Sequence, residues 1–111
     1  MAYDEALANR VRDALSTRAA VVEKKMFGGI AFMVEGNLAV GVRGGELLVR
    51  MAEEDARNAL AQDGVRPFDM GGGRRQPKGW VLVGDDRISD DAGLGEWVDV
   101  GADYAASLPA K

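Results

Sequence analysis

The loop from Gly71 to Gly79 (GGGRRQPKG) carries the residues best suited to bind an anion. Its glycines expose backbone N–H groups, and Arg74, Arg75 and Lys78 bring three cations that can meet a phosphate or a carboxylate. It is not a P-loop, because no Gly-Lys-Ser/Thr follows the glycines and no helix is expected to begin there. Two interpretations stay open. One is a small-ligand or anion-binding loop; the other, which we favour, is a connection kept in solvent by its charges.

A second group of candidate binding residues lies at the start of the first apolar run. Lys24 and Lys25 directly precede a methionine and Phe27-Gly28-Gly29. A basic pair beside exposed Met and Phe side chains would suit contact with a protein partner. We favour the alternative, a core strand entered through two solvated lysines. In that interpretation the glycines allow a helix to pack closely. Their place early in the strand also suggests a bulge or a point where another backbone comes close.

Arg50 lies within an otherwise apolar segment, LLVRM. Its side chain can extend to the edge of a sheet, pair with an acid such as Asp69, or present its guanidinium to a ligand. We favour pairing within the fold.

The chain contains no histidine and no cysteine among its 111 residues. Disulfides, thiolate chemistry and the commonest general base are therefore excluded, and an enzyme would have to work with carboxylates or lysine. Any metal site would consist of oxygen ligands. The pairs Asp85-Asp86 and Asp90-Asp91 lack the spacing of a calcium loop and are more simply a turn and a helix cap. We assign no catalytic residue, no metal site and no cofactor.

The length of the chain predicts a single domain over residues 1–111. The net charge of −4 argues against direct nucleic-acid binding, which depends on neutralising phosphates. The first residues carry charges throughout and lack the apolar run of a signal peptide. The apolar runs elsewhere are shorter than the roughly 18 residues that a membrane-spanning helix needs. We therefore expect a cytoplasmic protein.

These candidate residues must be positioned by a sheet, which residues 24–51 predict. The run from Met26 to Val34 is apolar on both alternating faces, as in a central strand. Glu35-Gly36-Asn37 then supplies residues that tolerate positive φ in a tight hairpin. Return strands follow at 38–43 and 46–51, so that three strands and two tight turns predict an antiparallel meander.

Helices are expected before and after this sheet. Residues 3–18 and the last part of the chain carry apolar stripes at helical spacing, the latter capped by Ser89, Asp90 or Asp91. A short helix begins near residue 53, an edge strand is expected at 65–70, and another strand at 80–83. The core is expected to include the aromatic residues Trp80, Trp97 and Tyr104. The predicted fold is α+β in the order α-βββ-α-ββ-α, with an antiparallel sheet of about five strands covered by the N- and C-terminal helices.

The sequence resembles the N-terminal domain of the TfoX/Sxy family over essentially its whole length. The segments that carry the likeness, in order, are Lys25-Met26-Phe27-Gly28-Gly29, Gly36 to Val42, Leu47 to Arg50, Arg66-Pro67-Phe68, Lys78-Gly79-Trp80, and Trp97 with Ala105 to Pro109. The best-known members couple this domain to a second, C-terminal domain and act as positive regulators of natural competence. This sequence ends at Lys111, so we expect a stand-alone N-terminal domain.

The resemblance and the residues together predict a non-catalytic regulatory or adaptor domain. Its working surface would contact another protein, and a second copy of the chain is one candidate partner. By resemblance, the setting is competence or transcription regulation in a bacterium. The alternative function is small-ligand or anion binding through the loop at 71–79.

Overall fold

The computed structural model describes residues 3–26, 28–68 and 79–110. Its elements follow one another in the order α1 (Glu5–Ala14), β1 (Val21–Met26), β2 (Gly29–Val34), β3 (Asn37–Arg43), β4 (Glu46–Arg50), α2 (Glu53–Ala59), β5 (Val65–Pro67), β6 (Trp80–Val83), the 3-10 helix η1 (Asp85–Arg87) and α3 (Asp91–Ser107). This order is the predicted one with an additional strand, β1, before the meander.

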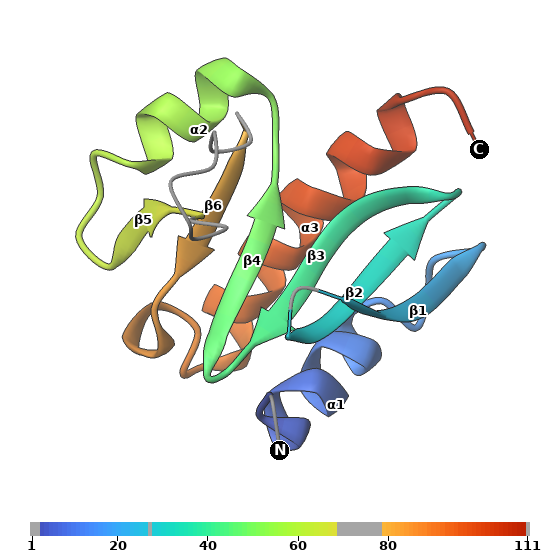
Figure 1. The fold of residues 1–111 in the computed structure, drawn as a ribbon, viewed down its shortest axis with the longest axis horizontal. Coiled ribbons are helices and arrows are strands. Elements are labelled where there is room, and N and C mark those ends of the chain that lie inside the picture. The colour runs from blue at the N-terminus through green and yellow to red at the C-terminus, as the bar shows by residue number, and fades with distance from the viewer. Residues whose placement is uncertain (1–2, 27, 69–78, 111) are drawn as a thin grey trace.

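The described strands form one six-stranded antiparallel sheet in the order β1-β2-β3-β4-β6-β5. α1 and α3 cover one face of this sheet (Figure 1), and their apolar side chains join those of the central strands in one core cluster. The predicted α+β class, the meander and the covering helices are confirmed. The sheet has six strands rather than about five, and β1 and β5 are its two edges.

The prediction of one strand over residues 26–34 is wrong. The chain forms β1 first, turns at Gly28 (φ +75°) and begins β2 at Gly29. β1 has the sequence VVEKKM, and all of its residues after the half-buried Val21 are exposed. A strand of this kind shows no alternation of apolar residues. Backbone pairing with β2 along its whole length holds it in place, and burial of its side chains does not.

The central strands bury residues on both faces, as their sequences predict. Toward the helices they contribute to the main core, together with residues of the helices. On the opposite face lies a second, smaller cluster, which consists of Ala31, Leu38, Leu48, Phe68 and Leu82. We refer to this side as the second face of the sheet.

β3 contains a bulge at Ala39. Phe32 pairs with Val40, whereas the next residue, Met33, pairs with Leu38, so Ala39 has no opposite residue in β2. A bulge bends its strand and increases the local twist. Figure 1 shows β3 curving across α3.

α1 is shorter than the predicted helix over residues 3–18. Asp4 caps it by accepting a hydrogen bond from the Leu7 N–H at 3.1 Å, and it ends at Ala14. Leu7 and Val11 are buried as predicted, whereas Ala6 is exposed and Ala8 is buried in its place. The buried stripe is therefore rotated slightly from the predicted one.

α3 begins after Asp90, one of the three predicted caps. The Asp90 side chain accepts a hydrogen bond from the Gly93 N–H at 2.8 Å. The helix ends at Ser107, before Pro109, because proline cannot continue it. Near this end the buried side chain of Asn37 donates hydrogen bonds to the Ala105 oxygen at 3.4 Å and to the Pro109 oxygen at 3.0 Å.

The β2–β3 turn uses positive φ at two of its three predicted positions. Glu35 has φ +52° and Gly36 has φ +83°. Asn37, the third predicted residue, is instead the first residue of β3 and satisfies carbonyls at the end of α3. Its side chain therefore joins the turn to the last helix.

Trp80, Trp97 and Tyr104, expected in the core, are only partly buried. Trp97 borders the main core and Trp80 borders the second cluster. Of the helices in the described parts of the chain, none is both long enough and apolar enough to cross a membrane.

Candidate interaction surfaces

Lys24 and Lys25 lie in the middle of edge strand β1 and point to opposite faces of the sheet. Lys24 is opposite Ala31 of the second cluster, and Lys25 is opposite Ile30, which faces the helices. Because successive side chains of a strand alternate between faces, the two ammonium groups do not form one basic patch. The expectation that these lysines lead into a core strand is wrong, since the core strand begins only at Gly29.

β1 also exposes apolar side chains. Val22 is 53% exposed and Met26 is 39% exposed, and both alternate onto the second face together with Lys24. Phe27, predicted to share a contact surface with Met26, lies outside the described residues. The described part of that predicted surface lies in β1, at the edge of the sheet, and carries both charged and apolar side chains.

Gly28 and Gly29 have structural roles. Gly28 takes the positive φ of the β1–β2 turn. A β-carbon at Gly29 would lie 2.0 Å from the carbonyl oxygen of Val42 in β3, so another backbone does come close at this position, as predicted.

Arg50 stacks on an aromatic ring. Its guanidinium carbon lies 5.5 Å from the centre of the Tyr104 ring on α3. This contact is a cation–π interaction, in which the ring face attracts the positive charge. Asp69, the acid suggested as its partner, lies outside the described residues, and no pattern in the sequence indicates Tyr104 as the contact.

Arg74, Arg75 and Lys78 lie outside the described residues, so anion binding by their loop stays a prediction. The last residue of that loop, Gly79, is described. Its oxygen accepts a hydrogen bond from the Met51 N–H at 2.8 Å, and a β-carbon on it would lie 2.4 Å from the Met51 oxygen. Gly79 therefore joins the end of β4 to the start of β6.

A groove of about 480 Å³ lies between α2 and α3. This groove was not predicted from the sequence. Its residues come from the two helices, from η1 and from the segments that follow β4 and α2, and they are Met51, Asp55, Asn58, Ala59, Gln62, Arg87, Glu96, Trp97 and Val100. Val100 is 40% exposed and follows Trp97 by three residues, so the two lie on neighbouring positions of one helix face. Val100 stands apart from the buried stripe of α3, and this additional apolar residue was the available signal.

The groove has charged groups on both walls. Asp55 belongs to α2 and Glu96 to α3, and both are exposed. Arg87 donates hydrogen bonds to the Gln62 side-chain oxygen at 2.7 Å and to the Asp63 carbonyl at 2.6 Å. Its guanidinium thus links the segment after α2 to η1. Because both of its partners are neutral, its positive charge stays in the groove beside the two carboxylates.

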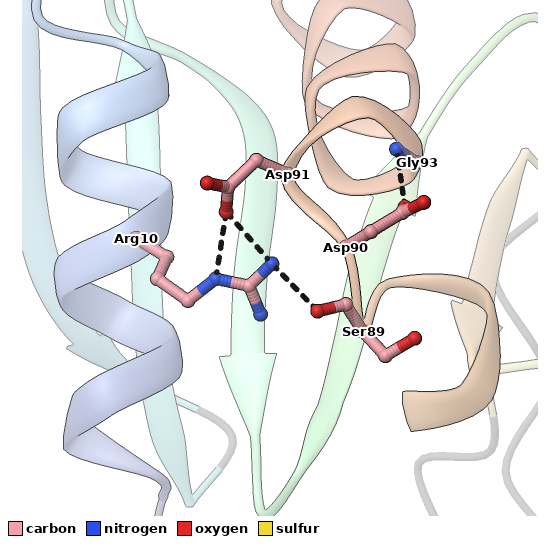
Figure 2. Close-up of polar contacts among 5 residues, drawn as sticks. All are labelled: Arg10, Ser89, Asp90, Asp91 and Gly93. Atoms are coloured by element: carbon pink, nitrogen blue, oxygen red, sulfur yellow. Dashed lines mark hydrogen bonds and ion pairs between the residues drawn. The ribbon is translucent and has the colours of Figure 1, made fainter.

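A second hollow, of about 450 Å³, separates α1 from α3 and is bordered by ion pairs. Arg10 of α1 contacts Asp91 at 3.1 Å and also bonds the Ser89 carbonyl at 3.4 Å (Figure 2). Next to this contact, Asp90 turns away toward Gly93 and caps α3 (Figure 2). The predicted role of Asp90-Asp91 at a helix cap is therefore confirmed, and Asp91 additionally holds α1 against α3.

The pKa shifts at the helix side of the molecule arise from ion pairs. Arg12 of α1 contacts both carboxylate oxygens of Glu23 in β1, at 2.6 and 2.7 Å. These hydrogen bonds, with the charge of Arg12, lower the pKa of Glu23. Hydrogen bonding to Asp103 raises the pKa of Arg18, which also contacts Asp99.

The comparison with protein families gives one decisive result. The TfoX N-terminal domain profile matches residues 13–105. The chain belongs to the TfoX N-terminal domain family. Searches of curated proteins and of solved structures gave no significant match. The region shared with the TfoX N-terminal domain runs from within α1 to within α3, and includes both β1 and the groove between α2 and α3.

Proposed function

We propose that this TfoX N-terminal domain is a non-catalytic regulatory or adaptor module that acts by contacting another protein. The family membership supports a regulatory setting, and the resemblance described above points to competence or transcription regulation in the bacterial cytoplasm. In this proposal the domain contacts protein rather than nucleic acid, and uses no cofactor.

The observation that carries the proposal is the groove between α2 and α3. Partly buried Trp97 and exposed Val100 provide an apolar surface, which is typical of the centre of a protein contact. Asp55 and Glu96 on its two walls outnumber the one cation of the groove, Arg87, and so favour a partner of positive charge. We infer a peptide segment in which one apolar anchor is flanked by Lys or Arg.

The residue content supports a non-catalytic role. The chain has no histidine or cysteine. The acids at the α1–α3 junction are engaged in capping and ion pairing, as Asp90 and Asp91 show. An enzyme would need carboxylates or a lysine brought together in a cleft with matched pKa values.

Selection from a displayed peptide library, followed by calorimetry on purified peptides, tests this proposal. The enriched peptides should carry an apolar residue next to Lys or Arg. Val100→Lys places a cation in the groove and should weaken their binding at least tenfold, because like charges repel across the contact. Val22→Lys, the same change at an exposed valine on β1 outside the groove, should leave the affinity unchanged.

Two outcomes would contradict the proposal. One is a selection without enrichment of any sequence. The other is enriched peptides that bind the Val100→Lys variant as tightly as the original chain. Circular dichroism of both variants confirms that the fold is retained.

A further inference from the structure

Edge strand β1 has an unusual composition for its position. It lies at the end of the described sheet (Figure 1), where the outer side of a strand presents unpaired N–H and C=O groups. Proteins often protect such edges with lysine. Here Lys24 and Lys25 are accompanied by Glu23 and by the exposed Val22 and Met26, so the edge combines both charges with apolar side chains.

The register of β1 shows which backbone groups point outward. Ala20 and Glu35 continue the β1–β2 ladder, and the Glu35 N–H donates to the Ala20 oxygen at 3.0 Å. In an antiparallel pair, hydrogen-bonded and non-hydrogen-bonded pairs alternate. Residues 22, 24 and 26 therefore bond toward β2, and the backbone groups of residues 21, 23 and 25 point away from the sheet.

We propose that β1 pairs antiparallel with β1 of a second copy, with Lys24 on the two-fold axis, and so joins two sheets edge to edge. This inference rests on the proposed contact function, because it names one partner for it, but it uses a different surface. In this register Glu23, whose carboxylate also pairs with Arg12 of its own chain, lies opposite Lys25 of the second copy, and Lys25 lies opposite its Glu23. Each pair exchanges two backbone hydrogen bonds.

The same register also matches the apolar side chains. Val22 lies opposite Met26 of the second copy on the second face, and the reverse pair forms by symmetry. Opposite charges and apolar pairs directly across two strands are stabilising. One unfavourable pair remains, Lys24 with its own copy, and it limits the strength of the association.

The neighbouring registers are worse. Moving the axis to Glu23 places that carboxylate opposite its own copy and sets Val22 opposite a lysine. Moving it to Lys25 places two lysines in a hydrogen-bonded pair and removes both Glu–Lys pairs. Like charges directly opposite each other are destabilising. The two lysines thus make pairing unfavourable in the neighbouring registers. The single glutamate makes pairing with a second copy favourable in one register, because it lies opposite a lysine there.

The opposite edge of the sheet keeps the assembly at two copies. β5 is only three residues long, Val65–Pro67, and Pro67 has no N–H to donate. A short edge with proline does not extend a sheet. The pairing at β1 therefore closes as a symmetric dimer.

Cysteine cross-linking provides a sharp test, because the chain has no cysteine of its own. In a non-hydrogen-bonded antiparallel pair the two α-carbons are about 4.5 Å apart, which suits a disulfide. Lys24→Cys should therefore cross-link with itself to near completion under mild oxidation. Val22→Cys is the matched control: its two copies would be four residues out of register and well beyond the roughly 7 Å limit for bridging.

Charge exchange tests the register independently. Glu23→Lys and Lys25→Glu should each be monomeric in sedimentation experiments, since both create like pairs. A mixture of the two variants should recover the dimer, because each chain then meets opposite charges. The unmodified chain should show a concentration-dependent monomer–dimer equilibrium.

Three results would overturn the pairing: a monomer at every concentration up to about 1 mM, equal cross-linking of Lys24→Cys and Val22→Cys, or no recovery in the mixture. A monomer at every concentration would mean that β1 does not pair with a second copy, and a strand of another protein would then be the remaining partner for this edge. Peptide binding at the α2–α3 groove is measured separately with Val100→Lys, so failure of the β1 pairing and failure of the proposed function give different patterns.

Discussion

The α-carbon of Gly101 in α3 lies directly against the backbone carbonyl of Ala39 in β3. A β-carbon at Gly101 would be 2.4 Å from the Ala39 oxygen and 2.6 Å from Cγ1 of Val40, closer than side chains pack in proteins. Ala39 is the bulged residue of β3. The last helix therefore rests on the bulge through the one residue type that has no side chain.

Gly101→Ala should destabilise the domain by about 1–2 kcal/mol. Overpacking of this kind costs about 1–3 kcal/mol, and the better helix propensity of alanine offsets up to about 1 kcal/mol of it. Urea unfolding measures the difference.

Gly95 in the same helix provides the matched control. A β-carbon there would meet no other atom within 4 Å. Gly95→Ala should therefore raise the free energy of unfolding by up to about 1 kcal/mol. Equal effects at the two glycines would show that helix propensity, and not contact with β3, decides both.

This contact illustrates what the sequence predicts and what it does not. The spacing of Leu94, Val98 and Ala105 indicates the buried face of α3 and places Gly101 on it. The bulge at Ala39 depends on how β2 and β3 pair, which no local pattern records. β1 escaped prediction for a related reason, since backbone pairing rather than apolar periodicity holds an exposed edge strand.

Asp90 and Asp91 are adjacent but should differ in their contribution to stability. Asp90 caps α3, and its replacement by alanine should cost about 1 kcal/mol. Asp91 forms an ion pair with Arg10 while its side chain stays 95% exposed, so Asp91→Ala should cost less, about 0.2–0.5 kcal/mol. Thermal unfolding of the two variants, repeated at high salt, checks the order. Salt should reduce the effect of Asp91→Ala more than that of Asp90→Ala, because the ion pair is exposed whereas the cap also makes a hydrogen bond to the Gly93 N–H.

Asn37 should be more sensitive to charge than to truncation. Its buried amide donates to two carbonyl oxygens at the end of α3. Asn37→Ala removes these bonds and should cost about 1–3 kcal/mol. Asn37→Asp places a carboxylate against the same two oxygens at the negative end of the helix dipole, so it should cost more.

The comparison is made by urea unfolding at neutral pH, with Asn58→Ala on the exposed side of α2 as the control, expected within about 0.5 kcal/mol of the original chain. A smaller loss for Asn37→Asp than for Asn37→Ala would refute the assigned hydrogen bonds.

The sequence predicted features of the candidate surfaces only where the local pattern around a residue indicates its role. Of the roles expected for Gly29, a bulge, close helix packing or close approach of another backbone, the structure shows the last, at Val42. The groove between α2 and α3 joins residues far apart in the chain, such as Asp55 and Glu96, and neither helix alone indicates it. Arg50 was expected to find a partner within the fold, but its contact with Tyr104 depends on where α3 crosses the end of β4.

The ion pair between Arg12 and Glu23 should make part of the stability depend on pH. Hydrogen bonds and charge from Arg12 lower the pKa of Glu23 in the folded state. The folded chain therefore favours the carboxylate, and the resulting stabilisation is complete above the ordinary glutamate pKa of about 4.3 and is lost as the pH falls through the lower folded pKa. Because both side chains are partly exposed, we expect about 0.2–1 kcal/mol.

Urea unfolding of the original chain and of Arg12→Met, at low protein concentration and from pH 7 to pH 3, measures this contribution. The difference in free energy between the two proteins should be constant above about pH 5 and should shrink below about pH 4.3, once Glu23 is protonated. Arg57→Met is the control, since Arg57 is exposed on α2 and forms no ion pair within the described residues. Its difference from the original chain should not follow the titration of Glu23. A difference for Arg12→Met that stays constant down to pH 3 would mean that this arginine stabilises the fold through packing or its bond to Asn9 rather than through Glu23.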